Sequence, residues 1–429
     1  MTESAVLFLQ GPLGPFFKQL ARTFSKAGYT THKINFNGGD RLFSWAHVQT
    51  QYKGKPADWA AFLKQYLIKH SIEAVFLMGD CRYYHRTAKP VCDALGVKFC
   101  VFEEGYLRPD TITLEPQGVN SLSQMALNRE KLEKVTPCSA KSSQSIGGTM
   151  KRRTVYAAFY YWASCFFRDE FSEYRHHRAS HPVKEGFYWL RGFARKWLFK
   201  SYDQQMQFRL DNEFDQRFYL VPLQVHDDSQ MIFHSPYESV KAFIQEVMTS
   251  FWKYADSDKI LCLKHHPMDR GYTDYGQFIE SLATQLGIQD RVLYCHDIPL
   301  PDLYHHTCGV ITVNSTVGIS ALLHHLPTKV MGRAFYDIEG ITHQGSLKSF
   351  WSNPQPVDRH LFKQLHTFLF QKTQINGSFF KYYDLTCKNS LAFYEAHLKP
   401  ISITQHSEQD THSPSTVAPS TSSPYSSAA

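Results

Sequence analysis

Short apolar runs alternate with amphipathic stretches along the first part of the chain. The runs have the length of buried strands, and the stretches between them repeat apolar residues at helical spacing. The predicted strands cover residues 5–9, 31–36, 74–78 and 97–102, with helices from about 16 to 24, over 59–69 and over 84–95. Strands separated by helices favour a parallel sheet with right-handed crossovers.

The same alternation returns in the second half of the chain. It predicts strands over residues 218–223, 260–264, 292–294, 309–313 and 328–331, helices over 236–251, 275–287 and 315–324, and a closing helix near 361–370. We therefore expect an N-terminal α/β domain over 1–130, an insertion over 131–216 and a second α/β domain over 217–400. The Ser-, Thr- and Pro-rich residues 401–429 are predicted to be disordered, because burial cannot offset the entropy of ordering them.

The insertion combines basic and aromatic residues. A 13-residue run rich in Tyr, Phe and Trp (155–167) follows Lys151, Arg152 and Arg153, and the interleaving continues to Lys200. Such a segment fits an interfacial helix facing anionic lipid, and equally a helical insertion packed on the core with a solvated basic face. No RNA- or DNA-binding motif is visible, so nucleic acid is not an expected partner.

Composition narrows the class of protein. The 429 residues are 43% hydrophobic, and no apolar run approaches the ~20 residues that span a bilayer. The first residues lack a basic region and a cleavage site, so no secretory signal is expected. Nine cysteines form no CxxC pair and no zinc-like spacing, which favours reduced thiols and a cytoplasmic protein.

Two adjacent acids end the fourth predicted strand, in the stretch Phe102-Glu103-Glu104-Gly105-Tyr106-Leu107-Arg108-Pro109. Neighbouring side chains on a strand point to opposite faces, so only one acid can face a given ligand. Acids at the carboxyl end of an interior strand lie where open α/β sheets bind ligands. Taken alone, the pair also fits a solvated turn.

Other predicted strands of this domain also end in polar or glycine-rich turns, and these turns would lie at the same edge of the sheet. They contain Gln10-Gly11, Asn37-Gly38 and Asp80-Cys81-Arg82. None matches the GxGxxG dinucleotide fingerprint, and prolines around Gly11 remove backbone donors. Each fits a loop beside a substrate or an ordinary turn.

Two strand ends of the second domain carry groups that suit an anion. Lys264-His265-His266-Pro267 combines a compact positive charge with two imidazoles. Asn314-Ser315-Thr316 leads into a predicted helix, whose free N–H groups favour negative charge. Read with the two acids, these motifs indicate a cleft with carboxylates on one wall and a phosphate site on the other. That division of labour fits glycosyl transfer from a sugar nucleotide.

These motifs, in this order, resemble the capsule polysaccharide synthesis and export family, and among it the KpsS/LipB-like β-Kdo transferases of Gram-negative bacteria. The resemblance covers nearly the whole folded chain and implies a GT-B-like architecture with two Rossmann-like domains. It implies a retaining transfer of Kdo from CMP-Kdo to phosphatidylglycerol or its lyso form, which begins the poly-Kdo linker of capsular polysaccharide. It further implies a peripheral protein at the cytoplasmic face of the inner membrane, beside other capsule synthesis and export proteins.

The resemblance also implies roles for the motif residues. Glu104 matches the aspartate of a Glu-Asp-Gly motif in related Kdo transferases, so it is the expected nucleophile, with Glu103 or Asp80 as alternatives. Lys264, His265, His266, Asn314, Ser315 and Thr316 are expected to bind the donor, and Arg82 or Arg108 its carboxylate. The implied donor already carries its leaving group on cytidine monophosphate, so neither a metal nor another cofactor is expected. Two alternatives stay open: a transferase using another donor or acceptor, such as CMP-sialic acid, and a non-catalytic subunit of the capsule assembly and export complex.

Overall fold

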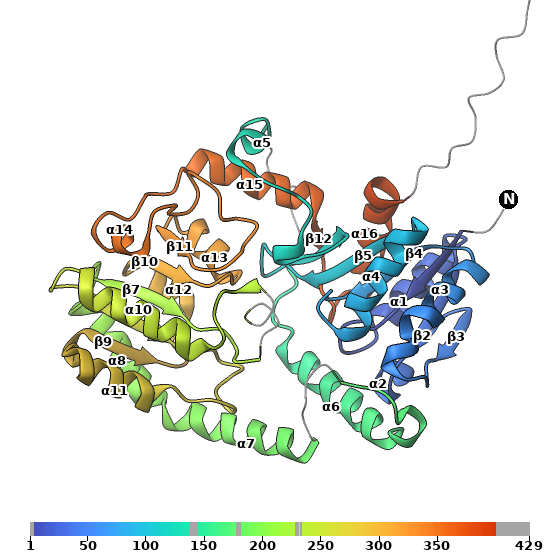
Figure 1. The fold of residues 1–429 in the computed structure, drawn as a ribbon, viewed down its shortest axis with the longest axis horizontal. Coiled ribbons are helices and arrows are strands. Elements are labelled where there is room, and N and C mark those ends of the chain that lie inside the picture. The colour runs from blue at the N-terminus through green and yellow to red at the C-terminus, as the bar shows by residue number, and fades with distance from the viewer. Residues whose placement is uncertain (1–3, 138–143, 177–181, 228–230, 232–233, 400–429) are drawn as a thin grey trace, which may run out of the picture. The chain divides into compact units, whose positions relative to one another are not determined.

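The computed structural model describes residues 4–137, 144–176, 182–227, 231 and 234–399. The chain up to Lys399 forms one compact unit, which contains two sheets with helices on their faces (Figure 1). The tail predicted to be disordered, 401–429, lies outside the described residues. No helix of the described residues has both the length and the apolar composition needed to cross a bilayer.

The first sheet has the strand order β12-β6-β5-β4-β1-β2-β3. Its strands are β1 (Ala5–Phe8), β2 (Thr30–Asn35), β3 (Val48–Gln51), β4 (Ile72–Met78), β5 (Lys98–Glu104), β6 (Thr111–Pro116) and β12 (Gln374–Asn376). Strands β1 to β5 are parallel, and β6 runs antiparallel to both of its neighbours. The order β3-β2-β1-β4-β5 is that of a doubly wound fold, in which the strand order reverses between β1 and β4.

The second sheet is entirely parallel and has the order β11-β10-β7-β8-β9. Its strands are β7 (Phe218–Pro222), β8 (Ile260–Lys264), β9 (Val292–Cys295), β10 (Thr307–Thr312) and β11 (Thr328–Val330). Read from β9, this is the doubly wound order again, with the reversal between β7 and β10. Two Rossmann-like sheets, as the GT-B-like expectation requires, are thus confirmed.

Helices connect the strands, and some of them begin or end at recognisable capping residues. They are α1 (Phe16–Lys26), α2 (Gly38–Leu42), α3 (Trp59–Lys69), α4 (Tyr83–Leu95), α5 (Arg129–Glu133), α6 (Met150–Phe166), α7 (Pro182–Leu198), α8 (Lys200–Asn212), α10 (Val240–Tyr254), α11 (Gly276–Leu286), α12 (Leu300–Tyr304), α13 (Val317–Leu323), α14 (Leu347–Ser352), α15 (Arg359–Lys372) and α16 (Tyr383–Phe393). The Ser239 side chain accepts a hydrogen bond from the Ala242 N–H at the start of α10. Gly96 ends α4 in the left-handed conformation.

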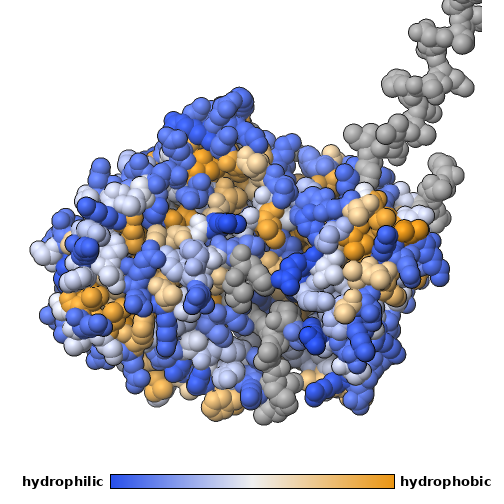
Figure 2. All heavy atoms as spheres, viewed as in Figure 1, coloured by the Kyte–Doolittle hydropathy of each residue, from blue (hydrophilic) through white to orange (hydrophobic). Residues whose placement is uncertain are grey.

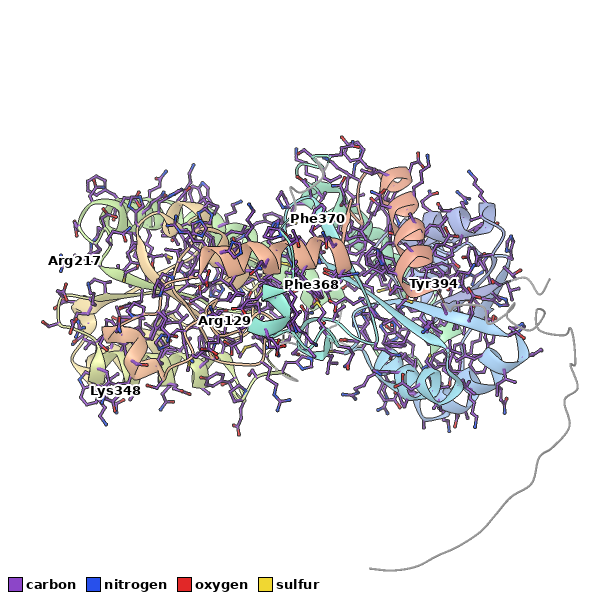
Figure 3. The ribbon with its side chains drawn as sticks, turned by 90° about the horizontal axis from the view of Figure 1, so that it is seen from above. Arg129, Arg217, Lys348, Phe368, Phe370 and Tyr394 are labelled. Carbon is purple, nitrogen blue, oxygen red and sulfur yellow. The ribbon has the colours of Figure 1, made fainter. Side chains whose placement is uncertain are left out.

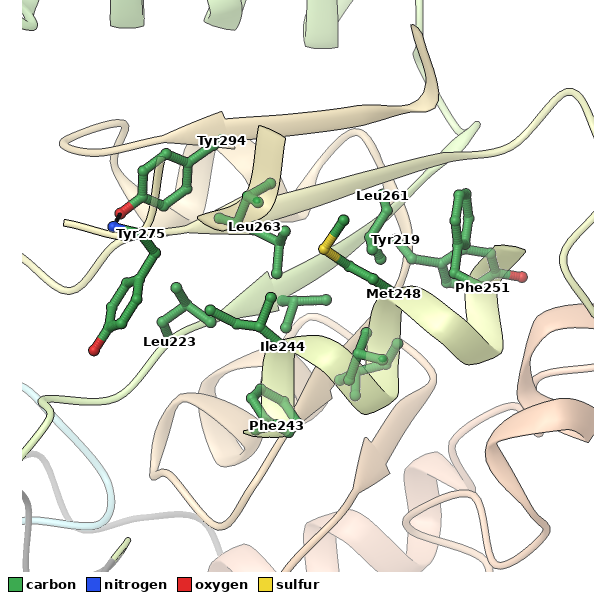
Figure 4. Packing of buried hydrophobic residues seen from close by; sticks show 14 of the residues in the cluster. Tyr219, Leu223, Phe243, Ile244, Met248, Phe251, Leu261, Leu263, Tyr275 and Tyr294 are labelled. Atoms are coloured by element: carbon green, nitrogen blue, oxygen red, sulfur yellow. Dashed lines mark hydrogen bonds between the residues drawn. The ribbon is translucent and has the colours of Figure 1, made fainter. Parts of the chain in front are cut away.

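Each sheet buries apolar side chains on both faces. Figure 4 shows one such core, where Ile244, Met248 and Phe251 of α10 pack under Leu261 and Leu263 of β8. In the first sheet, Phe99 and Val101 of β5 join the core under α3 and α4, whereas Cys100 and Phe102 join the core under α1 and α16. The alternation of side chains along β5 therefore directs Glu103 and Glu104 to opposite faces, as expected.

A further core joins the two sheets. Tyr106 and Leu107, which follow β5, pack in one buried cluster with Ile319 and Leu322 of α13 and with Leu365 of α15. Figure 3 shows α15 between the half of the unit that contains Arg217 and Lys348 and the half that contains Tyr394, with Phe368 and Phe370 in the last turns of the helix. The carboxyl ends of β5 and β10 are thus held by shared packing.

The structure differs from the sequence division in two places. Strands β3, β6 and β12 were not predicted, and β6 makes the first sheet mixed, because the tight turn after Glu104 sends the chain back along β5. Residues 374–399, assigned from sequence to the second domain, belong instead to the first sheet: Ile375 and Phe379 are buried beside α1. Long-range pairing of a three-residue strand leaves no periodic signal in the sequence.

The insertion lies against the first sheet through α6. Helix α2 begins at Gly38, and a Cβ there would lie 2.1 Å from the carbonyl oxygen of Ala163 in α6. A Cβ on Gly39 would meet the Tyr160 ring at 2.6 Å. Only glycine permits this approach of two backbones.

Replacing Gly38 by alanine should therefore destabilise the protein. The added methyl group must separate α2 from α6, at a cost of about 1–3 kcal/mol of unfolding free energy. Urea denaturation of the variant and the wild type measures this difference. As a control, Gly148→Ala adds a methyl group into open space and should change stability by less than ~0.5 kcal/mol. Equal stability of both variants would contradict the packing described for α2 and α6.

Candidate functional site

Three carboxylates meet where β4 and β5 end. The two strands are parallel neighbours with Met78 opposite Phe102. Asp80 and Glu103, which come just after these residues, therefore lie at neighbouring strand ends. Asp80 is buried, and its two oxygens accept hydrogen bonds from the Val119 N–H (2.9 Å) and the Cys81 thiol (3.2 Å). These bonds fix the Asp80 carboxylate against the first sheet.

Glu103 is enclosed at this edge. Removal from water, with a smaller contribution from the Glu104 and Asp80 charges, raises its pKa from 4.5 to about 7, although Arg108 opposes the shift. The Glu103 carboxyl accepts a hydrogen bond from the Glu104 N–H at 2.9 Å. Near neutral pH this side chain can therefore both hold and release a proton.

Glu104 lies on the other face of β5 and pairs with a cation of the insertion. The Nη1 atom of Arg153, in α6, is 3.4 Å from Glu104 Oε1, and both side chains are about one-third exposed. Arg153 also lies over the Phe380 ring, 5.8 Å from its centroid. The two acids at the end of β5 therefore have different partners: the Glu103 carboxyl accepts from the Glu104 N–H, whereas the Glu104 carboxylate is paired with Arg153.

The turn after the acids is built from Gly105, Tyr106, Leu107 and Arg108. A Cβ on Gly105 would lie 2.2 Å from the Thr111 carbonyl oxygen, so the tight return into β6 requires glycine. Tyr106 and Leu107 are buried, whereas Arg108 is exposed and donates to the Gly105 carbonyl at 3.0 Å.

Behind this turn lies a second enclosed carboxyl group. Tyr106 donates to Glu115 Oε1 at 2.6 Å, and Ser123 donates to the other oxygen. Burial raises the pKa of Glu115 to about 7. The buried Glu115 carboxyl thus stabilises the turn through its hydrogen bond to Tyr106.

A hydrogen-bonded path leads from this edge to the second sheet. The Cys81 thiol lies 3.3 Å from His234 Nε2, and the His234 carbonyl accepts from Asn314 Nδ2 at 3.1 Å. Asn314 Oδ1 accepts from Gln224 Nε2 at 3.0 Å. Gln224 follows β7 and Asn314 follows β10, so this last bond spans the point where the second sheet reverses, the usual ligand position in such sheets.

The motif at the end of β8 lies at the same edge of the second sheet. Lys264 is buried and donates to the carbonyl oxygens of His296 (3.2 Å) and His265 (3.5 Å). Burial lowers the pKa of His265 to about 4, so its ring is neutral at pH 7. Its Nδ1 atom is 2.6 Å from the Tyr294 hydroxyl, whereas Nε2 is buried without a hydrogen-bond partner among the described residues.

His266, at the edge of the second sheet, is affected by a charge that follows the last strand of parallel neighbours in the first sheet, that of Arg108. Burial lowers its pKa to about 4, and the positive charges of Lys264 and Arg108 add to this effect. Arg108 therefore acts on His266 of the second sheet and on Glu103 of the first. Together with the path through His234, the shared influence of Arg108 indicates that the acids of the first sheet face the His266 corner of the second.

Ser315 and Thr316 form the turn into α13. The Ser315 hydroxyl accepts from the Val317 N–H at 3.2 Å, and its carbonyl accepts from the Tyr336 hydroxyl at 2.5 Å. Thr316 precedes the first helical residue and makes no side-chain capping bond. These two residues adjoin Asn314, but Ser315 Oγ is already used within the turn.

The side chains of the loop candidates Gln10 and Asn37 are bonded to tyrosines of the insertion, and Gly11 and Gly38 are closely packed. Gln10 donates to Asp40 and to the Tyr174 hydroxyl, and Asn37 donates to the Tyr160 hydroxyl. A Cβ on Gly11 would meet the Phe17 ring at 2.7 Å. The insertion therefore fills this half of the edge, and these four residues serve internal packing in the structure.

Arg82 belongs to the same half of the edge. Its charge acts on the tyrosines of the insertion, Tyr160 and Tyr174, and on Lys33. The charge of Arg108, by contrast, acts on both Glu103 and His266. Of the two arginines proposed for a sugar carboxylate, only Arg108 is thus coupled to both groups of site residues.

Sequence reasoning missed several residues of the site. Gln224 directly follows a predicted strand, so its position at the carboxyl edge was a usable signal. His234 and Arg153 come from distant segments and left none, because only the fold brings them to the edge. Within the described part of the chain, no three His, Cys, Asp or Glu side chains are grouped as a metal site would require.

The raised pKa values of Glu103 and Glu115 predict a pH-dependent stability. Between pH 4.5 and 7 the folded chain holds protons on these carboxyls that the unfolded chain has released, so the unfolding free energy should fall as pH rises through this window. Glu103→Gln should flatten the fall by roughly 1–3 kcal/mol, measured by urea denaturation at several pH values. Glu133→Gln, on the exposed face of α5, should leave the slope unchanged; a wild-type slope retained in Glu103→Gln would show that Glu103 titrates normally.

Comparison with known proteins supplies the family. Residues 73–380 match the family model described as "Capsule polysaccharide biosynthesis protein". The "Capsule polysaccharide export protein KpsS" of Escherichia coli is 40% identical over 374 residues, which cover 87% of this chain and 96% of that protein. The "Capsule polysaccharide modification protein LipB" of Neisseria meningitidis serogroup A is 38% identical over 405 residues, 91% of this chain and 95% of that protein.

A more distant likeness is structural. The solved structure of the Thermosulfurimonas dismutans KpsC, a β-Kdo 2,7 transferase, is 12% identical, covers 85% of this chain and 89% of its own, and gives a TM-score of 0.40. At that score it carries no argument about this chain. The match to the family model and the two full-length relatives show that this chain belongs to the capsule polysaccharide biosynthesis protein family.

Proposed function

We propose that the protein is a retaining β-Kdo glycosyltransferase. It moves Kdo from CMP-Kdo to phosphatidylglycerol or its lyso form and so begins the poly-Kdo linker of capsular polysaccharide. The family, whose members include capsule export and modification proteins, supports the pathway. The observation that carries the chemistry is the meeting of three carboxylates at one sheet edge with Lys264, His265 and His266 at the other, coupled through Arg108.

Retention of configuration calls for two displacements at the anomeric carbon. In the first, the Glu104 carboxylate forms a bond to that carbon while the bond to the phosphate oxygen breaks and CMP departs with the electron pair. Glu104 is the better nucleophile of the β5 pair, because Arg153 orients its carboxylate and its side chain is partly exposed. Arg153 keeps the carboxylate oriented until the sugar replaces it.

In the second displacement, the acceptor hydroxyl attacks the same carbon and Glu104 leaves as a free carboxylate. The hydroxyl proton must pass to a base. Glu103 points to the other face of β5, but it lies at the same strand end and has a pKa of about 7, so we assign it this role with a water molecule carrying the proton around the strand end. Asp80 is already bonded by the Val119 N–H and the Cys81 thiol, so we assign it to positioning the edge rather than to bond formation.

The donor phosphate is proposed to bind at the edge of the second sheet. The buried Nε2 atom of His265 and the Oε1 atom of Gln224 have no partner among the described residues, so a bound nucleotide can engage both. Lys264 is proposed to contribute positive charge without contacting the phosphate directly, because its ammonium donates to two backbone carbonyls. His266, Asn314, Ser315 and Thr316 complete the proposed donor site.

Arg108 is proposed to bind the carboxylate of Kdo. Arg108 is exposed and its charge acts on both Glu103 and His266, and arginine grips a carboxylate with two parallel hydrogen bonds. Arg108→Lys should therefore raise KM for CMP-Kdo about 10-fold or more, because lysine offers only a point charge. Arg82→Lys is the matched control and should leave KM within about twofold, since Arg82 lies with the tyrosines of the insertion.

Glu104→Gln should abolish transfer while leaving the fold intact. Loss of the nucleophile is expected to reduce kcat by about 10³-fold or more, whereas CMP binding should be unchanged. Glu103→Gln should cost about 10²-fold. The assay incubates each variant with CMP-Kdo and either lipid and weighs the lipid by mass spectrometry.

The same assay separates the alternatives. A wild-type lipid product heavier by one Kdo residue supports the proposal; no gain with either lipid would refute it. A product formed from CMP-sialic acid instead would identify a transferase with another donor. Capsule assembly that proceeds normally with Glu104→Gln would indicate a non-catalytic subunit of the capsule complex.

A further inference from the structure

Two helices of the insertion present their apolar sides to solvent. In α6, Val155, Phe159, Trp162 and Phe166 form one exposed stripe at helical spacing, and the Trp162 side chain is 59% exposed. The opposite side of α6, with Ala157, Tyr160 and Ala163, is buried on the first sheet. A surface helix of a soluble protein ordinarily places its apolar side the other way.

Helix α7 is inverted even more clearly. Its exposed apolar residues lie within one side of the helix, and Trp197 reaches 78% exposure. They are Phe187, Trp189, Leu190, Phe193, Trp197 and Leu198. The polar side is the anchored one: Arg191 donates to the carbonyls of Gly271 (2.6 Å) and Tyr272 (2.8 Å), and Arg195 donates to those of Arg270 and Thr273, both at 2.9 Å.

The surroundings of these stripes are cationic. Residues 150–200 contain 11 Lys and Arg and 4 Asp and Glu, a net charge of +7 that equals that of the whole chain. Seven of the cations are exposed and form no ion pair with another described residue: Lys151, Arg152, Arg168, Arg175, Lys184, Lys196 and Lys200. Two of the four acids, Glu170 and Glu185, are bonded to other parts of the protein.

Figure 1 places α6 and α7 along the lower margin of the compact unit, and Figure 2 shows apolar residues reaching the surface there among charged ones. An apolar stripe rich in Trp and Phe, flanked by Lys and Arg, is the pattern of a helix that lies in the interface of an anionic bilayer. We infer that the outer sides of α6 and α7, called here the docking face, bind an anionic membrane surface.

The docking face is tied to both halves of the candidate site. Arg153, on the inner side of α6, pairs with Glu104. Helix α7 rests on residues 270–273, which directly follow the His265-His266-Pro267 corner. This inference deepens the proposed function, because a docked enzyme would hold its acids and its donor site at a fixed place relative to a lipid acceptor.

The test is binding of the full-length protein to vesicles, without any sugar nucleotide. Wild type should float with vesicles containing phosphatidylglycerol, bind vesicles of phosphatidylcholine alone at least 10-fold more weakly, and lose affinity as salt rises. A docking variant, Trp162→Ser with Phe193→Ser and Trp197→Ser, should lose at least 10-fold in affinity. The matched control is Ile68→Ser with Trp252→Ser, two apolar residues exposed elsewhere, and should bind like the wild type.

A charge variant tests the electrostatic part. Arg152→Gln with Lys196→Gln and Lys200→Gln should weaken binding to phosphatidylglycerol vesicles by about fivefold per charge and reduce the salt dependence. Unchanged binding of the docking variant, or equal binding of wild type to both kinds of vesicle, would overturn the inference. So would a wild-type dimer that the docking variant converts to monomers, because the face would then be a contact between copies.

Two readouts keep this test separate from the proposed function. The docking variant should still transfer Kdo to lyso-phosphatidylglycerol supplied as dispersed monomers, at a rate within about threefold of wild type. Vesicle binding without any transfer would leave the docking face standing and refute the transferase. Transfer of Kdo by a wild-type protein that does not bind vesicles would support the transferase and refute the docking face.

Discussion

The turn from β5 into β6 is the constraint on which the rest of the site depends. Gly105 lets the chain pass within contact of the Thr111 carbonyl, so the two acids stop at the sheet edge instead of continuing the strand. The next two residues, Tyr106 and Leu107, enter the core shared with α13 and α15. Arg108 then emerges beside both groups of site residues. The six consecutive residues from Glu103 to Arg108 thus supply two carboxylates, a joint between the sheets and a cation.

This turn also explains why the two acids differ although they are adjacent. Strand geometry sends them to opposite faces, and each face meets a different environment. Glu103 is enclosed beside Asp80, where burial favours its neutral form, whereas Glu104 meets the guanidinium of Arg153. A pair of carboxyl groups with separate environments can divide proton transfer and bond formation between them. The insertion contributes directly, because Arg153 comes from α6.

Much of this arrangement could be predicted from the sequence, and the reason is local. The bounds of α3 and β8 agree with the structure, because each is a strongly patterned segment bounded by turn residues. Strand ends mark the carboxyl edge of a sheet, so the positions of the acids, of Lys264 and of Asn314 at these edges could be predicted. Their partners could not be predicted, because His234 and Arg153 reach the edge only through the fold. Asn37 and Gly38 look like a ligand loop in sequence, yet they pack against α6.

The account centres on Glu104 as the group that bonds to the sugar. Incubating the protein with CMP-Kdo but no lipid, then quenching and mapping its peptides by mass spectrometry, tests this directly. The account predicts a peptide heavier by one Kdo residue, with the modification on Glu104, and its absence from Glu104→Gln. A modification on Glu103 or Asp80, or an enzyme that turns over without carrying any adduct, would contradict it.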